Sequence, residues 1–143
     1  MTHISIALRR LVSERAGYRC EYCLLPEEFS SFSHEPDHVT PLKHGGATIA
    51  DNLALACFWC NRLKGSDLAA LDPQTGQITS LFNPRLHTWT DHFRLEGAMI
   101  IPLTPEGRAT AALLKFNRAD RLTARLLLFK FGYYSFGKRN QSQ

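Results

Sequence analysis

The sequence has no apolar run long enough to cross a membrane, and charged residues make up only 21% of it. The longest purely apolar run near its C-terminus, Leu126–Phe129, is far shorter than the ~20 residues of a spanning helix. Arg9 and Arg10 interrupt the first apolar residues, which argues against a secretory signal peptide. The 143 residues are 44% hydrophobic, enough to bury a core. We therefore expect a small globular protein in the cytoplasm.

Acidic residues are scarce in the last quarter of the chain. Residues 105–143 contain eight basic and only two acidic side chains, within a total net charge of +4. Such an asymmetry favours a polyanionic partner. A solvated helix face is an equally good explanation of this charge alone.

Periodicity predicts a mixed α+β protein. Apolar positions spaced as in an amphipathic helix occupy residues 5–16, and short strands are expected at 37–42 and 52–56. A helix should follow from about residue 60 to 68, and residues 71–88 should form a loop with one short strand. Residues 89–95 and 98–103 flank Glu96-Gly97 and predict a β-hairpin. We divide the chain into a core at residues 1–70 and an extension at 71–143.

Two helices are expected to close the chain. Thr104 as N-cap and Pro105 at the first position predict a helix. Its inward side chains would be Ala109, Ala112, Leu113 and Phe116. Asn117 is expected to cap a second helix. The inward side chains of that helix would be Leu122, Leu126 and Phe129. The polar tail at 138–143 is expected to fray.

The four cysteines form two pairs with the same spacing. They are Cys20, Cys23, Cys57 and Cys60. A two-residue spacer lets both thiolates of a pair bind one ion, so two such pairs can complete a tetrahedral zinc site. Disulfides and a redox-active cysteine pair are the alternatives, and a cytosolic chain argues against disulfides. We favour a closed, structural zinc site with a functional segment inserted between the two pairs.

The inserted segment contains Asp37-His38 and Asn52, and Asn61 follows the last cysteine. Taken singly, such residues usually have structural roles. Together they offer oxygen ligands for Mg²⁺ or Mn²⁺, from Asp37 and Asn61, beside an imidazole that can accept a proton near pH 7. The Asn52 amide is placed to hold the backbone next to His38.

These residues carry a resemblance to a known family. The stretch Asp37-His38-Val39-Thr40-Pro41-Leu42-Lys43-His44-Gly45-Gly46, followed by residues 51–65 with the second cysteine pair, resembles the HNH endonucleases. The three motif residues would be His38, Asn52 and Asn61, which is the H-N-N form. The resemblance covers about residues 18–66. More loosely, residues 81–85 and 89–93 resemble small stand-alone bacterial members.

The resemblance implies a ββα-metal fold, treble-clef-like and braced by a zinc ion with four cysteine ligands, with a catalytic divalent ion beside it. It implies a DNA endonuclease that leaves 3′-hydroxyl and 5′-phosphate ends, and a single site favours nicking. By this resemblance His38 is the general base, Asp37 and Asn61 bind the ion, and Asn52 orients the loop that carries His38. No small-molecule cofactor or membrane partner is expected, and the protein could be a monomer or a homodimer.

Other basic residues are weaker candidates for contacts with nucleic acid, most simply with double-stranded DNA. They are Arg62, Lys64, His44, Arg118, Arg121 and Arg125. The aromatic residues Phe58 and Trp59 are expected in the core rather than as stacking platforms. Two other functions stay open: a non-catalytic zinc-knuckle module that binds nucleic acid, and a zinc-stabilised interaction domain.

Overall fold

The structure, a computed structural model, describes residues 3–135 of the chain. Its helices are α1 (Ile6–Arg15), α2 (Phe58–Lys64), α3 (Trp89–His92), α4 (Pro105–Leu113) and α5 (Ala119–Lys130). Its strands are β1 (Glu35–His38), β2 (Leu53–Ala56), β3 (Ala69–Leu71), β4 (Ile78–Ser80), β5 (Phe93–Glu96) and β6 (Met99–Pro102). These strands form three separate antiparallel pairs, β1–β2, β3–β4 and β5–β6. The predicted α+β class is thus observed.

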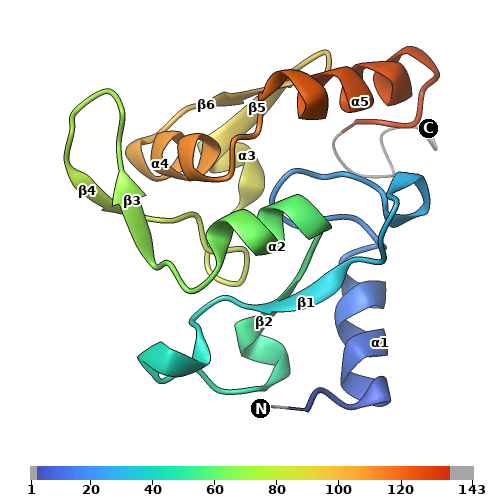
Figure 1. The fold of residues 1–143 in the computed structure, drawn as a ribbon, viewed down its shortest axis with the longest axis vertical. Helices are drawn as coiled ribbons and strands as arrows, with labels where there is room; N and C mark the ends of the chain where they lie inside the picture. The colour runs from blue at the N-terminus through green and yellow to red at the C-terminus, as the bar shows by residue number, and fades with distance from the viewer. Residues whose placement is uncertain (1–2, 136–143) are drawn as a thin grey trace.

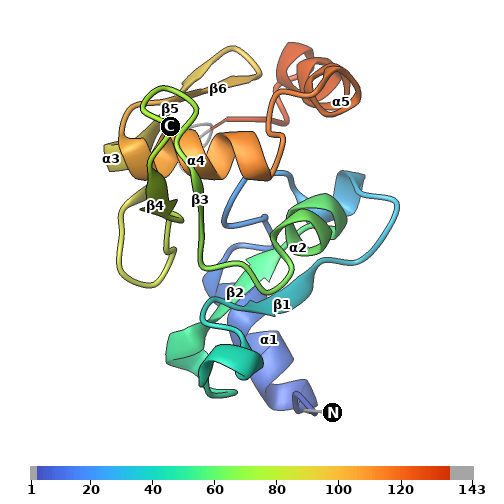
Figure 2. The same cartoon turned by 60° about the vertical axis from the view of Figure 1, so that its left-hand side comes forward.

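The β1–β2 pair lies between two helices. Side chains of a strand alternate between its faces. Leu53 and Leu55 therefore pack with Val12 of α1 in a small apolar cluster. Ala54 and Ala56 face the other way and belong to the main core. Figures 1 and 2 show α2 on that second side, between the strand pair and the C-terminal elements.

The main core joins residues from both sides of position 70. Tyr22 and Ala54 pack in one cluster with Phe82, Phe93 and Leu114. Several of these rings meet edge to face: Phe82 lies 6.4 Å from Tyr22 and 5.4 Å from Phe93 between ring centroids. The C-terminal elements therefore cover the first 70 residues with a shared core rather than a separate one.

Helix α4 begins as the sequence predicts. The Thr104 side chain accepts a hydrogen bond from the Gly107 amide at 3.0 Å, and Pro105 is the first helical residue. A Cβ on Gly107 would lie only 2.4 Å from the His92 carbonyl oxygen. Glycine at this position thus lets α4 approach the end of α3 closely. Ala109 is buried as expected, whereas Ala112 is exposed.

The orientation of α5 differs from the prediction. Arg121 and Arg125 are its buried residues, whereas Leu126 and Phe129 are each 46% exposed. The expected inward face of α5 is therefore wrong. The physical reason is that buried backbone carbonyls and cysteine sulfurs on the core side accept hydrogen bonds from the two guanidinium groups.

The other differences concern element boundaries. Asn117 does not cap α5; its side chain bonds both backbone groups of Ile100 on β6. The first half of the expected strand at 89–95 is the short helix α3, and residues 69–80 form a hairpin of two strands instead of one. The predicted fraying of 138–143 lies outside the described residues. No helix within residues 3–135 has both the length and the apolarity to cross a membrane.

Candidate functional site

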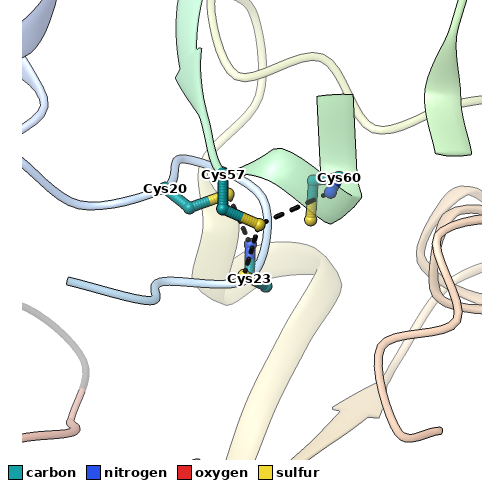
Figure 3. A group of neighbouring side chains, drawn as sticks. All are labelled: Cys20, Cys23, Cys57 and Cys60. Atoms are coloured by element: carbon teal, nitrogen blue, oxygen red, sulfur yellow. Dashed lines mark hydrogen bonds between the residues drawn. The ribbon is translucent and has the colours of Figure 1, made fainter. Parts of the chain in front are cut away.

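The four cysteines converge at one buried point (Figure 3). Their sulfur atoms all lie within 4.8 Å of one another, and Cys23 Sγ is 3.6 Å from Cys57 Sγ. Each cysteine is at most 2% exposed. Four sulfurs around a tetrahedral zinc, at about 2.3 Å from the metal, would be separated by about 3.8 Å. The cluster therefore fits a zinc ion in number, chemistry and spacing.

Backbone amides direct the sulfur atoms inward. Cys20 Sγ accepts from the amides of Tyr22 and Cys23, each at 3.4 Å. Cys57 is the N-cap of α2, and its sulfur accepts from the Cys60 amide at 3.4 Å. The same two-residue spacing thus produces the same turn geometry twice. Amide donors favour the thiolate form that a metal requires.

Arg121 reaches the cysteine cluster from α5. Its guanidinium lies 3.1 Å from Cys60 Sγ and 3.6 Å from Cys57 Sγ, and it also donates to the Leu114 carbonyl. Burial disfavours its charge, but the neighbouring thiolates raise the pKa of Arg121 above its usual value. Arg121 is only 7% exposed. The expectation that it faces a nucleic acid is therefore corrected: it balances the negative charge of the sulfurs.

Two more side chains from the C-terminal region hold the first cysteine turn. Trp89 Nε1 donates to the Tyr22 carbonyl at 2.9 Å, and the Tyr134 hydroxyl donates to the Cys23 carbonyl at 2.7 Å. Both side chains are buried. Residues far along the chain therefore close the cysteine cluster from the outside.

Asp37 occupies the face of β1 that is turned to α2. Its Oδ2 accepts from the Tyr22 hydroxyl at 2.8 Å and lies 3.2 Å from Lys64 Nζ. Burial raises the pKa of the Asp37 carboxyl, while Lys64 and Tyr22 act in the opposite direction. Within residues 3–135 both of these contacts use Oδ2, which leaves Oδ1 for another ligand.

His38 is the last residue of β1 and is partly buried. Its Nε2 lies 2.9 Å from the Thr48 hydroxyl. When Nε2 carries the proton and donates to Thr48, Nδ1 is the unprotonated nitrogen of the neutral ring. The Thr48 contact thus sets the orientation of the imidazole, and in this tautomer Nδ1 is the nitrogen that can accept a proton.

Asn52 holds the loop that follows His38. Its amide exchanges two hydrogen bonds with the Thr40 backbone, each 2.9 Å, and donates to the Ala47 carbonyl at 2.8 Å. Gly46 lies against the same backbone, since a Cβ there would be 1.7 Å from the Thr40 carbonyl oxygen. These contacts hold the backbone of the loop two residues after His38.

One cavity borders the three residues that the sequence places at the reaction centre. Asp37, His38 and Asn61 line an open cavity of about 280 Å³ between β1 and the end of α2. Lys43 and Ser66 line the same cavity. Since one water occupies roughly 30 Å³, a phosphate group and several waters would fit. The arrangement brings a carboxylate, an imidazole and an amide to one solvent-accessible space.

The remaining basic candidates lie in different environments. Lys64 is 2% exposed and donates to the carbonyls of His38 and Val39 at 3.2 Å, so it is a structural partner of Asp37 rather than a surface contact. Arg125 is 1% exposed and bonds Ala98, Phe116 and Asn117. Both expectations of a contact with nucleic acid are thereby corrected.

Three candidates keep surface positions. Arg62 is exposed on α2, and Arg118 is partly exposed and paired with Asp120 at 2.7 Å. His44 is exposed, and its Nε2 lies 3.1 Å from the Ser66 carbonyl oxygen, which ties the loop after β1 to the end of α2.

Sequence reasoning missed two residues that contact the site. Tyr22 lies inside the first cysteine pair, where its hydroxyl reaches Asp37. Thr48 lies ten residues after His38 in a turn-rich loop. No local pattern marks either of them, because each acts through a contact that only the folded chain creates.

Comparisons with known proteins agree with the motif. Residues 20–67 match the protein-family model described as HNH endonuclease. Comparison with curated proteins and with solved structures gave no match. The match spans both cysteine pairs and every residue of the proposed reaction centre. The predicted resemblance is thus confirmed over residues 20–67, which match the HNH endonuclease model and which we call the HNH domain.

Proposed function

We propose that the protein is a divalent-metal-dependent DNA endonuclease that hydrolyses one phosphodiester bond at a time. The observation that supports it best is the cavity shared by Asp37, His38 and Asn61. The match of residues 20–67 to the HNH endonuclease family supports the same activity. In this proposal the antiparallel β1–β2 pair and α2 form the ββα-metal core.

His38 acts as the general base. Its unprotonated nitrogen takes a proton from a water molecule, and the resulting hydroxide attacks the phosphorus of the scissile phosphodiester. The bond from phosphorus to O3′ breaks, and O3′ takes up a proton from water, which leaves a 3′-hydroxyl and a 5′-phosphate. Thr48 holds the imidazole at 2.9 Å, and Asn52 fixes the adjacent loop through the Ala47 carbonyl. Both are positioning residues.

Asp37 and Asn61 would hold the catalytic Mg²⁺ or Mn²⁺. Their carboxylate and amide oxygens suit a hard cation that keeps several of its waters. When bound, the ion supplies Lewis-acid stabilisation for charge on the phosphate and on the leaving oxygen. Lys64 and Tyr22 hold Asp37 by its Oδ2, so that Oδ1 is left for the ion. The four-cysteine cluster would hold zinc in a structural role.

This proposal assigns the chemistry to residues 1–70 and a covering role to residues 71–143. Double-stranded DNA, a cytoplasmic location and a single nicking site per protomer stay predictions of the sequence.

The decisive experiment is cleavage of supercoiled plasmid by zinc-loaded protein in Mg²⁺ or Mn²⁺. We expect nicked circles with the wild type and a loss of at least ~100-fold in His38→Ala, the scale of general-base catalysis. His3→Ala is the matched control, since His3 is exposed and lies before α1. Zinc content and thermal unfolding should be the same in all three proteins.

Equal cleavage by the wild type and His38→Ala would overturn the proposal. Salt-sensitive DNA binding without any product would instead support the non-catalytic zinc-knuckle module. Neither binding nor cleavage at low salt would favour an interaction domain.

A further inference from the structure

A group of aromatic and basic side chains lies on the surface beside the proposed reaction centre. We call it the aromatic–basic surface and define it by Phe32, Phe58, Trp59, Arg62 and Arg118. Phe32 is 59% exposed and Trp59 is 40% exposed. The expectation that Trp59 belongs to the core is therefore wrong, and the exposure of these rings requires an explanation.

The rings are arranged in order rather than scattered. Phe32 stacks on Phe58 with ring centroids 4.7 Å apart and an interplanar angle of 25°. Phe58 meets Trp59 edge to face at 5.1 Å. The most exposed ring, that of Phe32, stands at one end of this series. Its exposed surface offers a further planar group a place to stack.

Cations accompany the rings. The Arg62 guanidinium lies 5.4 Å from the Phe58 centroid, and that of Arg118, which also pairs with the exposed Asp120, lies 4.8 Å from the Trp59 centroid. Alternating aromatic and guanidinium groups are the two components of surfaces that bind a single strand: bases stack on the rings, and phosphates pair with the cations. An apolar protein partner would gain nothing from the two charges.

The aromatic–basic surface is continuous in sequence with the cavity. Arg62 follows Asn61, which lines the cavity, and Phe58 precedes Arg62 by one turn of α2. Phe32 lies just before β1, the strand that carries Asp37 and His38. The same two segments thus supply both the reaction centre and the rings, which places the α2 part of the aromatic–basic surface within one helical turn of Asn61.

We propose that the aromatic–basic surface binds unpaired DNA next to the scissile phosphate, with bases stacked on Phe32 and Trp59. The proposal rests on the proposed nuclease function for its position on the substrate. In a duplex the base faces are covered by their neighbours, so an exposed ring can stack only where a strand is single, frayed or gapped. The preferred substrate is therefore DNA with an unpaired segment at the cleavage site.

Binding can be measured apart from cleavage. Zinc-loaded His38→Ala protein without added divalent ions would be titrated with a fluorescent dT oligomer and with a duplex of equal length, and binding followed by anisotropy. We expect tighter binding of the single strand. Phe32→Leu and Trp59→Leu should each weaken it by roughly tenfold, the scale of one base–aromatic stack. Phe131→Leu is the control, because Phe131 is 72% exposed beyond α5.

Intrinsic fluorescence gives a second readout. Of the two tryptophans, Trp59 is exposed and Trp89 is only 7% exposed. Bound dT oligomer should therefore quench the Trp59 emission, and Phe32→Leu should reduce the quenching at a fixed oligomer concentration. Arg62→Gln should weaken binding and reduce its salt dependence, whereas Arg94→Gln on β5 should do neither. Unchanged thermal unfolding of each variant separates a binding effect from a folding effect.

The outcomes separate this inference from the nuclease proposal. Plasmid cleavage by the wild type, together with unchanged dT affinity in folded Phe32→Leu and Trp59→Leu, would overturn the aromatic–basic surface alone. Equal affinity for duplex and single strand would overturn it as well. Loss of dT binding in both variants without any cleavage by the wild type would support the surface and overturn the nuclease.

Discussion

Asp37 in the HNH domain and Asp72 in the C-terminal region are both buried, but their oxygens are used differently. The Tyr22 hydroxyl and the Lys64 ammonium both contact the same oxygen of Asp37, Oδ2. Both oxygens of Asp72 are used, because Arg108 binds them in a bidentate manner at 2.9 and 2.8 Å. Burial raises the pKa of Asp37, whereas the Arg108 hydrogen bonds lower the pKa of Asp72.

This difference distinguishes a carboxylate that can bind a ligand from one that only stabilises the fold. A buried polar group is expensive unless its hydrogen bonds are complete. Asp72 is completed within the chain, with further bonds from Gln74 and Thr75. Asp37 keeps an oxygen beside an open cavity. Asp72 therefore has its hydrogen bonds completed within the chain, whereas Asp37 keeps one oxygen for a ligand.

The largest expected effect tests the dependence of the HNH domain on a ligand. Cys57→Ser removes one sulfur from the cluster but keeps an oxygen that can cap α2, so the substitution tests the metal ligand rather than the helix cap. Binding energy of structural zinc is folding energy, on the order of 10 kcal/mol. We expect the variant to lose zinc and cooperative unfolding, measured by metal analysis and circular dichroism.

Chelation of the wild type by EDTA should give the same unfolded spectrum, which controls for effects of the substitution itself. A soluble Cys57→Ser protein that unfolds cooperatively without metal would show that the C-terminal contacts alone sustain the fold.

The next effect tests how much the buried hydrogen bonds of Arg125 in the C-terminal region stabilise the fold. The Arg125 guanidinium donates to the carbonyls of Ala98 and Phe116 and to the Asn117 side chain. Arg125→Met would leave the buried carbonyls of Ala98 and Phe116 without this donor, which should cost about 3 kcal/mol. Urea unfolding measures the loss.

Arg118→Met is the matched control at the start of the same helix. Its partner Asp120 is largely exposed, so water screens the ion pair and the substitution should change the free energy of unfolding far less. Equal stability of the two variants would mean that the buried bonds of Arg125 contribute nothing beyond an exposed ion pair.

The sequence predicted the first 70 residues better than the rest for a physical reason. The two-residue spacer in each cysteine pair sets its own turn, and Asn52 bonds backbone groups only five and twelve residues away, so much of this geometry follows from nearby sequence. The orientation of α5 is set instead by acceptors that come from distant parts of the chain. Apolar periodicity cannot show that Arg125 will find a carbonyl of Ala98, which precedes it by 27 residues.

Arg121 connects the two regions, and its replacement should have a moderate effect. Arg121→Gln removes the charge that faces Cys57 and Cys60. Outer partners of metal ligands typically change metal affinity by about 10- to 100-fold. We therefore expect faster zinc release to a colorimetric chelator, with Arg118→Gln unchanged and Arg121→Lys intermediate. Identical release from Arg121→Gln and the wild type would remove the link between α5 and the metal.

The smallest effect concerns acid stability. The folded-state pKa of Asp72 is depressed, so its carboxylate contributes stability at pH values above its unfolded pKa of ~3.9. That contribution is lost as the pH falls from about 4 toward the lower folded pKa. Asp72→Asn has no carboxylate and therefore lacks this contribution at every pH. The variant should be less stable than the wild type at pH 6, and the gap in urea unfolding should narrow as the pH approaches about 2.

Asp120→Asn gives the exposed counterpart of this experiment. Its ion pair with Arg118 also lowers the pKa of Asp120, but the Asp120 side chain is 61% exposed and water screens the interaction. Its stability gap should therefore be smaller than that of Asp72→Asn and should disappear in high salt. Both variants could instead differ from the wild type in unfolding free energy by the same amount at every pH and salt concentration. Burial of Asp72 would then add nothing to its ion pair with Arg108, and the contrast with Asp37 would rest on the number of hydrogen bonds alone.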